Sequence, residues 1–497
     1  MSARGSIRRV ALVEPPYVFW DRSMDRLRQS EESIPGFGML MLAAVARARG
    51  YEVRIFDAKG SGESPDRIAT GLLAFAPDVV GFSATTVSIA NADRIAQRVK
   101  AAAPQTITVV GGAHVSAVPE RTLAAFPALD YGMIGEGELS FFEFLARLGD
   151  GGGVGDCAGL VHRRGEEVVA NRRAPYITDL DALPRPAWDL VRGFPHRFHP
   201  SLLSYRRSPV ATLVTSRGCP FSCSFCDRST SGKLGRYHST ESVLRHCRHL
   251  VDLGVRHIIF YDDLFTVKRQ RVVEICEGFL AAGLDFTWSC NSHPNLLDFE
   301  TLRLMKRAGC WQIAYGIESG SQRILDVVKR EVRLPRMRET LRMTRAAGIR
   351  AKGYLMIGHP TETFETLEET AEFLRVVELD LCQITKFTPY PGTPAYPTIR
   401  AHGAFTEDWE RMNAMNFVFV PSGLSEAALE TQFHRLYSIF YSRLDVLRGI
   451  ARMVLEEPRF LRQLGSSAWV YLKSQLPNRH FRRGILGRRC PTESLAS

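Results

Sequence analysis

Short apolar segments alternate with amphipathic segments twice along this chain, first over residues 8–145 and again from Pro209. In the first series, the apolar runs predict strands and the segments with helical spacing predict helices. The expected strands are 9–13, 53–56, 79–82 and 106–110, and the expected helices lie near 38–49, 66–75 and 89–103. Such alternation indicates a doubly wound parallel sheet with helices on both faces, which binds ligands at its carboxyl strand ends.

The second series contains six strand–helix units. The expected strands are 210–215, 257–260, 286–290, 312–316, 351–357 and 381–388. Six units predict a partial (β/α)6 barrel rather than a complete eight-stranded one. Beyond Tyr396 the strand signal fades, and residues 425–475 have helical spacing.

The 497 residues are too many for one ordinary hydrophobic core. A glycine-rich break at 149–155, a short hairpin near 159–169 and an extended segment at 179–188 separate the two series. We therefore expect an α/β protein of four parts. These are a Rossmann-like domain at 1–148, a linker with a short hairpin at 149–204, a barrel at 205–400 and a helical C-terminal module at 401–497.

The composition, 45% hydrophobic and 24% charged, is typical of globular proteins. The apolar run at 10–13 is too short for a signal peptide, and the run at 38–46 is too short to span a membrane. We expect a cytoplasmic protein. Its ten cysteines are sparse and uneven, so clustered ones indicate metal binding rather than a disulfide framework.

The formal net charge of +11 is concentrated near the C-terminus, since residues 441–497 carry eleven Lys or Arg against four Asp or Glu. Aromatic residues lie among these arginines, as in a helix on an anionic membrane surface or an acidic partner. A solvated basic tail is the alternative. We expect no dedicated nucleic-acid-binding module.

Three cysteines lie together in the segment TSRGCPFSCSFCDRS, at positions Cys219, Cys223 and Cys226. They follow the first expected barrel strand, at the rim where barrels hold their active sites. Three thiolates can hold a [4Fe–4S] cluster while leaving one iron without a protein ligand. Alternatives are a zinc site, for which no fourth ligand lies at suitable spacing, and a chance grouping of buried thiols.

This motif, with Phe225 as the aromatic residue of CxxxCxΦC, resembles the signature of the radical S-adenosylmethionine family. The resemblance covers about residues 205–400. It implies that S-adenosylmethionine chelates the open iron and is cleaved to a 5′-deoxyadenosyl radical. It also implies that Glu318 and Ser319 bind the methionine or ribose part of the cofactor, that Ile357 lies near adenine and that Ser289 belongs to the cofactor site.

One departure from the family pattern follows the second barrel strand. Many members carry Gly-Gly-Glu there to bind the amino group of the cofactor, whereas this chain has Tyr261-Asp262-Asp263. Asp262 is our candidate for that role. A general-base or structural role of the two carboxylates is the alternative.

The segments following the strands of the first domain resemble the cobalamin-binding domain of radical S-adenosylmethionine enzymes. Small residues at the strand ends would let the corrin approach closely. The candidate cobalamin contacts are Ser83, Thr85, Gly111, Gly112, Ala113, Gly135 and Glu136. A cobalt-ligating Asp-x-His-x-x-Gly motif is absent, so cobalamin is expected to bind without a histidine ligand. His114 is interpreted as a hydrogen-bonding residue, and a domain that keeps the fold without binding cobalamin remains an alternative.

Together these features predict a cobalamin-dependent radical enzyme, a class B methylase-like member of the superfamily that also contains the anaerobic cyclase and hopanoid-tailoring enzymes. Its expected reaction is methylation of an unactivated carbon, with cyclisation, rearrangement or oxygen insertion as alternatives. A non-enzymatic cobalamin or metal sensor is the alternative from another class. The expected partners are a small-molecule substrate, lipid-like or tetrapyrrole, and an electron donor such as flavodoxin or ferredoxin.

Overall fold

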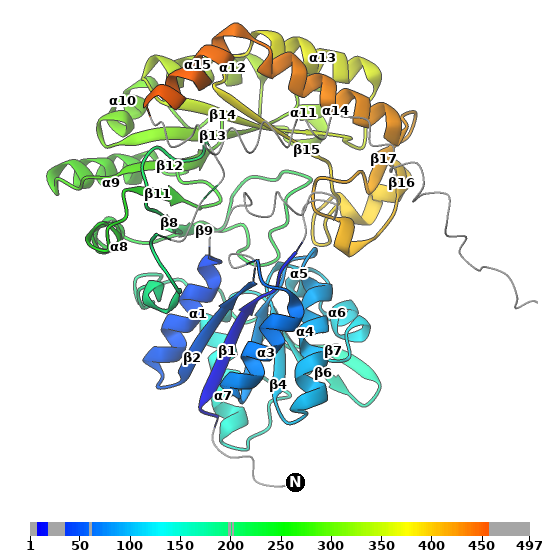
Figure 1. The fold of residues 1–497 in the computed structure, drawn as a ribbon. Helices are drawn as coiled ribbons and strands as arrows, with labels where there is room; N and C mark the ends of the chain where they lie inside the picture. The colour runs from blue at the N-terminus through cyan, green and yellow to red at the C-terminus, as the bar shows by residue number, and fades with distance from the viewer. Residues whose placement is uncertain (1–6, 18–34, 59–61, 197–199, 201–202, 457–497) are drawn as a thin grey trace, which may run out of the picture.

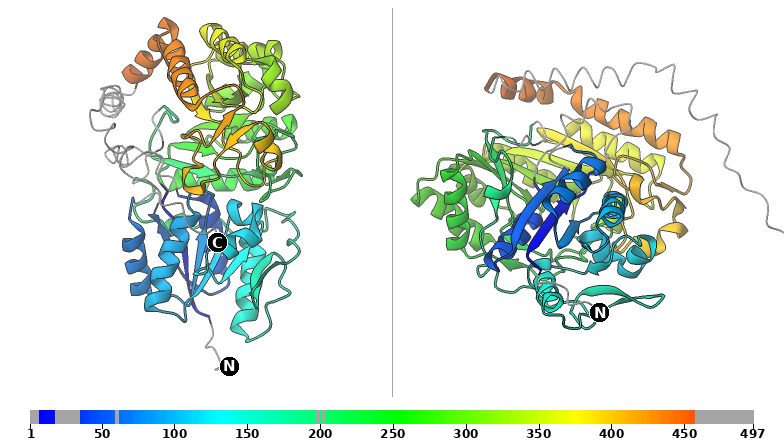
Figure 2. Two further views of the ribbon diagram at one scale, coloured as in Figure 1. Left: turned by 90° about the vertical axis from the view of Figure 1, so that its right-hand side faces the viewer. Right: turned by 60° about the horizontal axis from the view of Figure 1, so that its bottom comes forward.

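The computed structural model describes residues 7–17, 35–58, 62–196, 200 and 203–456. Two sheets are stacked, the first one blue to cyan and the second one green to yellow in Figure 1. The side view in Figure 2 shows the same stacking. Among the described residues, no helix is long and apolar enough to cross a membrane.

The first sheet has seven strands in the order β2-β1-β3-β4-β5-β6-β7. Its strands are β1 (Arg9–Glu14), β2 (Glu52–Asp57), β3 (Val79–Ser83), β4 (Ile107–Gly111), β5 (Tyr131–Met133), β6 (Leu160–Arg164) and β7 (Glu167–Ala170). The first five are parallel, while β6 and β7 join antiparallel. The hairpin expected within the 149–204 segment therefore extends the first sheet.

Helices cover both faces of this sheet. They are α1 (Phe37–Ala48), α3 (Pro65–Phe75), α4 (Ile89–Ala102), α5 (Ala113–Ala117), α6 (Pro119–Ala125) and α7 (Gly137–Gly149). Alternate residues of one strand point to opposite faces, so Val10 and Leu12 pack in one core while Ala11 and Val13 pack in the other. The expected doubly wound α/β domain is confirmed.

The second sheet has six parallel strands in the order β15-β14-β13-β12-β11-β8. The strands are β8 (Val210–Leu213), β11 (His257–Phe260), β12 (Thr287–Ser292), β13 (Cys310–Glu318), β14 (Arg350–Ile357) and β15 (Leu381–Lys386). Because β8 and β15 form the two ends of this order, the sheet is an open barrel, as expected. The same parallel order brings all six carboxyl strand ends to one rim.

Helices connect these strands, some of them with a side-chain cap at the first turn. They are α8 (Thr240–Asp252), α9 (Arg269–Ala281), α10 (Phe299–Arg307), α11 (Gln322–Val328), α12 (Leu334–Ala346) and α13 (Phe364–Val376). Asp298 caps α10, and Thr363 forms a capping box with Thr366 at the start of α13. Such side chains satisfy backbone N–H groups that the first turn leaves without a partner.

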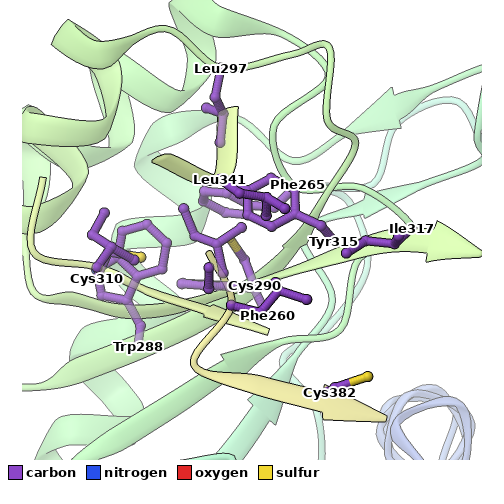
Figure 3. Packing of buried hydrophobic residues seen from close by; sticks show 14 of the residues in the cluster. Phe260, Phe265, Trp288, Cys290, Leu297, Cys310, Tyr315, Ile317, Leu341 and Cys382 are labelled. Carbon is purple, nitrogen blue, oxygen red and sulfur yellow. The ribbon is translucent and has the colours of Figure 1, made fainter. Parts of the chain in front are cut away.

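Apolar side chains fill the core between the barrel strands and the helices outside them, where Phe279 of α9 packs against Phe260 and Trp288. The rings of Phe260, Phe265 and Trp288 are in mutual contact, with centroids 4.7–5.5 Å apart. Cys290 and Cys310 lie in the same core, as Figure 3 shows. These two thiols therefore belong to the packed core.

The C-terminal part combines helices with a small hairpin. The helices α14 (Glu426–Tyr441) and α15 (Leu444–Glu456) lie on the side of the second sheet away from the first one (Figure 1). The hairpin pairs β16 (Gly403–Phe405) with β17 (Phe419–Pro421), and short 3-10 helices lie at 396–401 and 409–411. The helical module was expected, but three-residue strands are too short to give a periodic signal.

Candidate active site

A cavity of about 330 Å³ lies between the two sheets. Strand ends of the first domain form one side, including Ser83, Gly111 and Gly135. The other side comes from the segment after β8 and from the end of β11, including Arg217 and Asp263. The carboxyl edges of both sheets therefore face one shared cavity.

The candidate cobalamin contacts divide into two groups. Ser83, Gly111, Gly112, Gly135 and Glu136 line the cavity, whereas Thr85 and Ala113 are not among its lining residues. The Thr85 backbone N–H instead donates to Ser88 Oγ at 2.9 Å.

Gly112 is required by a close crossing of two loops. Its φ is +103°, and a Cβ there would lie 2.6 Å from the carbonyl oxygen of Ala84. Since L side chains rarely adopt this conformation, glycine lets the loops after β3 and β4 meet at the cavity edge.

His114 lies away from this cavity. It is buried, its Nδ1 lies 3.2 Å from Thr86 Oγ1, and its ring meets Trp409 edge-on at 4.5 Å. Burial lowers the pKa of His114 to about 4, so the ring is neutral. Among the described residues that line the cavity, none is histidine.

The three candidate cluster ligands lie on one hairpin. Its strands are β9 (Ser216–Arg217) and β10 (Arg236–Tyr237), which pair antiparallel and enclose residues 218–235. Cys219, Cys223 and Cys226 are each partly exposed in the connecting loop. The structure thus brings the three thiols to the barrel rim, beside the cavity.

Contacts with the barrel hold this loop in place. The Ser224 N–H donates to the Val328 carbonyl at 3.1 Å, and the Ser224 carbonyl accepts from the Ala395 N–H at 2.9 Å. Phe221 stacks on His293 with ring centroids 4.0 Å apart. The loop is therefore a packed part of the barrel rim.

Burial raises the pKa of Cys223 to about 11 and that of Cys226 to about 12. Metal coordination would hold such thiols as thiolates. Among the described residues, no three His, Cys, Asp or Glu side chains converge on a single metal-ion position. A cubane cluster does not require such convergence, because each cysteine binds a different iron. Cys219 and Cys223 lie within electrostatic reach of Cys226 on one partly exposed loop, and this grouping fits that donor set.

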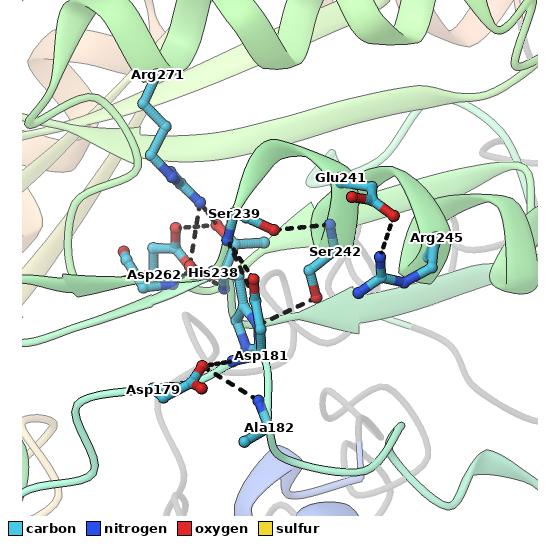
Figure 4. Close-up of polar contacts among 12 residues, drawn as sticks. Asp179, Asp181, Ala182, His238, Ser239, Glu241, Ser242, Arg245, Asp262 and Arg271 are labelled. Atoms are coloured by element: carbon cyan, nitrogen blue, oxygen red, sulfur yellow. Dashed lines mark hydrogen bonds and ion pairs between the residues drawn. The ribbon is translucent and has the colours of Figure 1, made fainter.

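Asp262 is buried directly behind the cysteine hairpin. Its carboxylate accepts hydrogen bonds from Thr215 N at 2.5 Å, Thr215 Oγ1 at 2.6 Å and Ser216 N at 3.1 Å. Arg271 lies on the other side of Thr215 and donates to its hydroxyl at 2.7 Å. Figure 4 shows Arg271 and Asp262 in this cluster. The contacts of Asp262 favour the structural alternative considered from the sequence.

Asp263 is the neighbouring carboxylate that faces the cavity. Its side chain is exposed to the cavity, yet desolvation by the surrounding protein and the charge of Asp262 raise its pKa, while a hydrogen bond from the Gly218 backbone lowers it. It also lies within electrostatic reach of Cys219 and Cys226. The sequence analysis favoured Asp262, because the local pattern does not show which of the two adjacent carboxylates faces the cavity.

Glu318 ends β13 and forms a buried ion pair with Lys329. Lys329 Nζ lies 3.1 Å from Glu318 Oε1 and donates to the Gly316 carbonyl at 2.7 Å. Glu318 has φ of +66°, a strained conformation for a residue with a side chain. The ammonium group also lies within electrostatic reach of Cys223. Lys329, which the sequence did not single out, thus links Glu318 to the cysteine loop.

The remaining candidates of the barrel lie in different environments. Ser319 is fully buried, with its Oγ 3.1 Å from Thr370 Oγ1, and Ile357 is buried in the barrel core. Phe225 packs on a small cluster that contains Phe387. Ser289 lies in the amino-terminal half of β12, with its Oγ 3.2 Å from His257 Nε2, so the structure does not bring it to the rim.

Glu136 and Glu138 connect the first domain to the cysteine hairpin. Glu136 lies within ion-pair distance of Arg217 and Arg236, and Glu138 pairs with Arg217. Glu138, Arg217 and Arg236 were not predicted as site residues. Arg217 lies two positions before Cys219, which is the one local signal that could have indicated it.

Two family models match this chain. The model described as the radical SAM superfamily matches residues 213–374, and the model described as the B12 binding domain matches residues 26–145. Together they cover more than half of the chain. The first matched segment lies in the barrel, and the second lies in the first α/β domain.

Relatives and solved structures agree with these matches. An uncharacterised methyltransferase of Pyrococcus horikoshii is 31% identical over 418 residues, which cover 83% of this chain and 89% of that protein. An anaerobic magnesium-protoporphyrin IX monomethyl ester cyclase of Cereibacter sphaeroides is 28% identical, covering 82% of this chain and 67% of that protein.

Among solved structures, the radical S-adenosylmethionine methyltransferase TsrM from Kitasatospora setae, with cobalamin and a [4Fe-4S] cluster bound, matches with a TM-score of 0.67. The identity is 17%, and the match covers 88% of this chain and 89% of that one. At this identity the match shows a shared fold.

Proposed function

Because the chain belongs to the radical S-adenosylmethionine enzymes that carry a B12-binding domain, we propose that it methylates an unactivated carbon of a small-molecule substrate. The observation that carries this proposal is the shared cavity. Its lining joins the strand ends of the B12-binding domain to the segment that begins the cysteine hairpin. In this proposal the two cofactor sites border one space in which a substrate can bind.

The chain is an enzyme that uses an iron–sulfur cluster, S-adenosylmethionine and cobalamin. When bound, the cluster and S-adenosylmethionine supply a 5′-deoxyadenosyl radical, and methylcobalamin supplies the methyl group. We assign Cys219, Cys223 and Cys226 as the cluster ligands, since they share one loop at the barrel rim. Glu318, held by Lys329, is our candidate for orienting S-adenosylmethionine.

The first domain supplies the cobalamin site in this proposal. Ser83, Gly111 and Gly112 offer little side chain at the cavity edge, as a corrin ring requires. The cobalamin would have no histidine ligand, because His114 lies outside the cavity lining and packs on Trp409. Asp263, with its raised pKa, is a candidate for holding a proton near the substrate.

A cobalamin-assisted cyclisation remains the second candidate. It is supported by the similarity to the anaerobic cyclase, which extends over 82% of this chain. The product separates the two reactions, because methylation replaces one hydrogen of the substrate with a methyl group, a net gain of CH2, and cyclisation does not.

The first experiment needs no identified substrate. The protein is purified anaerobically with cobalamin, reduced with titanium(III) citrate and incubated with S-adenosylmethionine. Formation of 5′-deoxyadenosine reports the radical half of the reaction, and S-adenosylhomocysteine reports the use of S-adenosylmethionine as a methyl donor. We expect both products, whereas 5′-deoxyadenosine alone would favour the cyclisation.

The matched variants for this experiment are Cys226→Ala and Cys247→Ala. Cys226 lies in the cysteine hairpin, whereas Cys247 is buried in α8 away from it. Cys226→Ala should lose the cluster and 5′-deoxyadenosine formation, while Cys247→Ala should keep both. A Cys226→Ala protein with normal iron content and product would contradict the ligand assignment.

Three further expectations from the sequence remain proposals. The division at residues 148, 204 and 400 is kept, with the hairpin β6–β7 joined to the first domain. The electron donor is proposed to be a flavodoxin or ferredoxin. The basic tail is proposed to contact an anionic membrane surface, although residues 457–497 lie outside the described part of the chain.

A further inference from the structure

Arg217 and Arg236 lie directly opposite each other in the short ladder that carries the cysteine loop. Both side chains are buried, with 12% and 4% of their surface exposed. Like charges in directly opposed positions destabilise a strand pair, and burial increases the cost. The hairpin therefore needs nearby negative charge to hold this conformation.

The compensating charges come from the other domain. Arg217 Nη2 lies 2.5 Å from Glu138 Oε1 and its Nη1 lies 3.2 Å from Glu136 Oε1, while Arg236 Nη1 lies 2.7 Å from Glu136 Oε2. The two glutamates are 5% and 7% exposed, at the start of α7. These four side chains, Glu136, Glu138, Arg217 and Arg236, are called the four-charge clamp below.

Further hydrogen bonds fix the clamp on both sides. Arg236 also donates to the carbonyls of Ile177 at 2.8 Å and Ser231 at 2.9 Å. Glu136 accepts from the Ile177 N–H at 2.9 Å. The clamp thus connects the first domain, the connecting segment and the cysteine loop through largely buried side chains.

A short and constrained connection joins the clamp to Cys219, the first candidate cluster ligand. Gly218 alone separates Arg217 from Cys219, and its φ is +87°. A Cβ at Gly218 would lie 2.3 Å from the carbonyl oxygen of Leu234, so the two sides of the loop are in close contact. A shift of Arg217 must therefore be passed on to Cys219.

Buried ion pairs contribute little net stability compared with apolar residues of similar volume, so stability alone does not account for this arrangement. We propose that the four-charge clamp positions the cysteine hairpin on the B12-binding domain and thereby sets the separation between the cluster and the cobalamin. This inference rests on the proposed function, because it assumes that both cofactors act across the shared cavity. Glu136, Glu138 and Arg217 also line the cavity, and Glu136 is a candidate cobalamin contact, but in this role the four residues are positioning residues that act through the hairpin.

The variants are Glu138→Gln, which removes a charge and keeps the shape, Arg217→Gln, which removes a charge and shortens the side chain, and the double variant. The control is Glu143→Gln, which removes a half-exposed charge from the same helix, where Glu143 pairs with Arg147. Iron and cobalamin contents are determined for every protein. The main measurement is pulsed dipolar EPR on partly reduced holoenzyme that contains both cob(II)alamin and the reduced cluster.

Wild type and Glu143→Gln should give the same narrow distribution of cluster–cobalt distances. Both clamp variants should give a broader or longer distribution, and the double variant should resemble either single one, because the two side chains act on each other. Unchanged distributions in both single variants, or additive effects in the double variant, would overturn the proposal.

A second measurement can be made even on variants that bind too little cofactor for EPR. Amide hydrogen exchange of residues 218–235 requires no cofactor and reports local opening of the loop. Both clamp variants should exchange there about tenfold faster or more than wild type, with no change in β1 and β3. Equal exchange in wild type and variants would overturn the proposal. Wild-type protein that binds no cobalamin would overturn the proposed function instead, and the exchange result would then decide the clamp by itself.

Discussion

Asp262 and Thr215 are joined by two hydrogen bonds where the chain leaves the first barrel strand for the cysteine hairpin. The Thr215 backbone N–H donates at 2.5 Å and its hydroxyl at 2.6 Å. Since β9 begins at the next residue, Ser216, this carboxylate fixes the direction in which the hairpin starts.

Asp262→Ala should therefore destabilise the protein and reduce its iron content. The substitution leaves the N–H groups of Thr215 and Ser216 buried without their acceptor. Hydrogen bonds to a charged group contribute about 1.5–3 kcal/mol each, so we expect a loss of about 3 kcal/mol or more. Anaerobic denaturant unfolding and iron determination measure the two effects.

The neighbouring residue provides the control. Asp263→Asn changes a carboxylate that faces the cavity, so stability and iron content should stay close to wild type. Asp262→Asn should be intermediate, because its amide oxygen can still accept from the backbone. Wild-type stability and iron content in Asp262→Ala would contradict this role for Asp262.

The sequence predicted most of the fold, because local periodicity determines it. The expected strand at 79–82 is β3 at Val79–Ser83, and all six barrel strands lie where they were expected. The pairing of β6 with β5 was not predictable in the same way. That contact joins segments whose own patterns do not encode their partner.

For the candidate site, the sequence predicted residue types at strand ends but not their partners. The two carboxylates after β11 were found, yet Asp262 is bonded to Thr215, 47 positions earlier. The clamp joins Arg217 to Glu138, 79 positions apart. Contacts of this kind depend on how the two domains pack, and a single sequence carries no local signal for them.

Lys329→Met should destabilise the protein and impair 5′-deoxyadenosine formation. It leaves Glu318 buried without its cation, since the two side chains are 6% and 8% exposed. Removing one partner of such a pair costs about 3–5 kcal/mol. The double variant Lys329→Met/Glu318→Gln should recover part of the stability, because no charge then remains buried.

The exposed ion pair between Arg323 and Glu369 gives the comparison for Lys329. Arg323→Met should change the free energy of unfolding by less than about 1 kcal/mol, because solvent screens this pair. Equal small effects of Lys329→Met and Arg323→Met on stability would contradict the importance of the buried pair.

Gly112→Ala should weaken cobalamin binding. The added Cβ would lie 2.6 Å from the Ala84 carbonyl oxygen, and φ of +103° is strained for alanine. We expect a loss of about 1–3 kcal/mol in stability, with a shift of the loops that line the cavity. Gly153→Ala is the control, because a Cβ there meets nothing within 4 Å. Spectroscopic titration with hydroxocobalamin measures binding, and equal affinity in both variants would contradict the role of Gly112.

Glu362→Gln should change how stability depends on pH. The Glu362 carboxyl is buried after β14, where its Oε2 accepts from the N–H groups of Gly358 and His359. Burial raises the pKa of Glu362 from its ordinary 4.5 to about 8. Folding therefore favours the protonated carboxyl. The contribution of Glu362 to stability is largest below pH 4.5 and decreases as the pH rises towards about 8.

The slope can reach about 1.4 kcal/mol per pH unit, and glutamine, which keeps the accepting oxygen but does not titrate, should remove it. Thermal unfolding between pH 6 and 8 should therefore show the Glu362→Gln protein gaining stability relative to wild type at each step. Glu365→Gln serves as the control, since that carboxylate is exposed and its pKa is lowered by the Thr363 hydroxyl. If the pH profiles of Glu362→Gln and wild type ran parallel, the buried carboxyl would not be protonated in the folded protein.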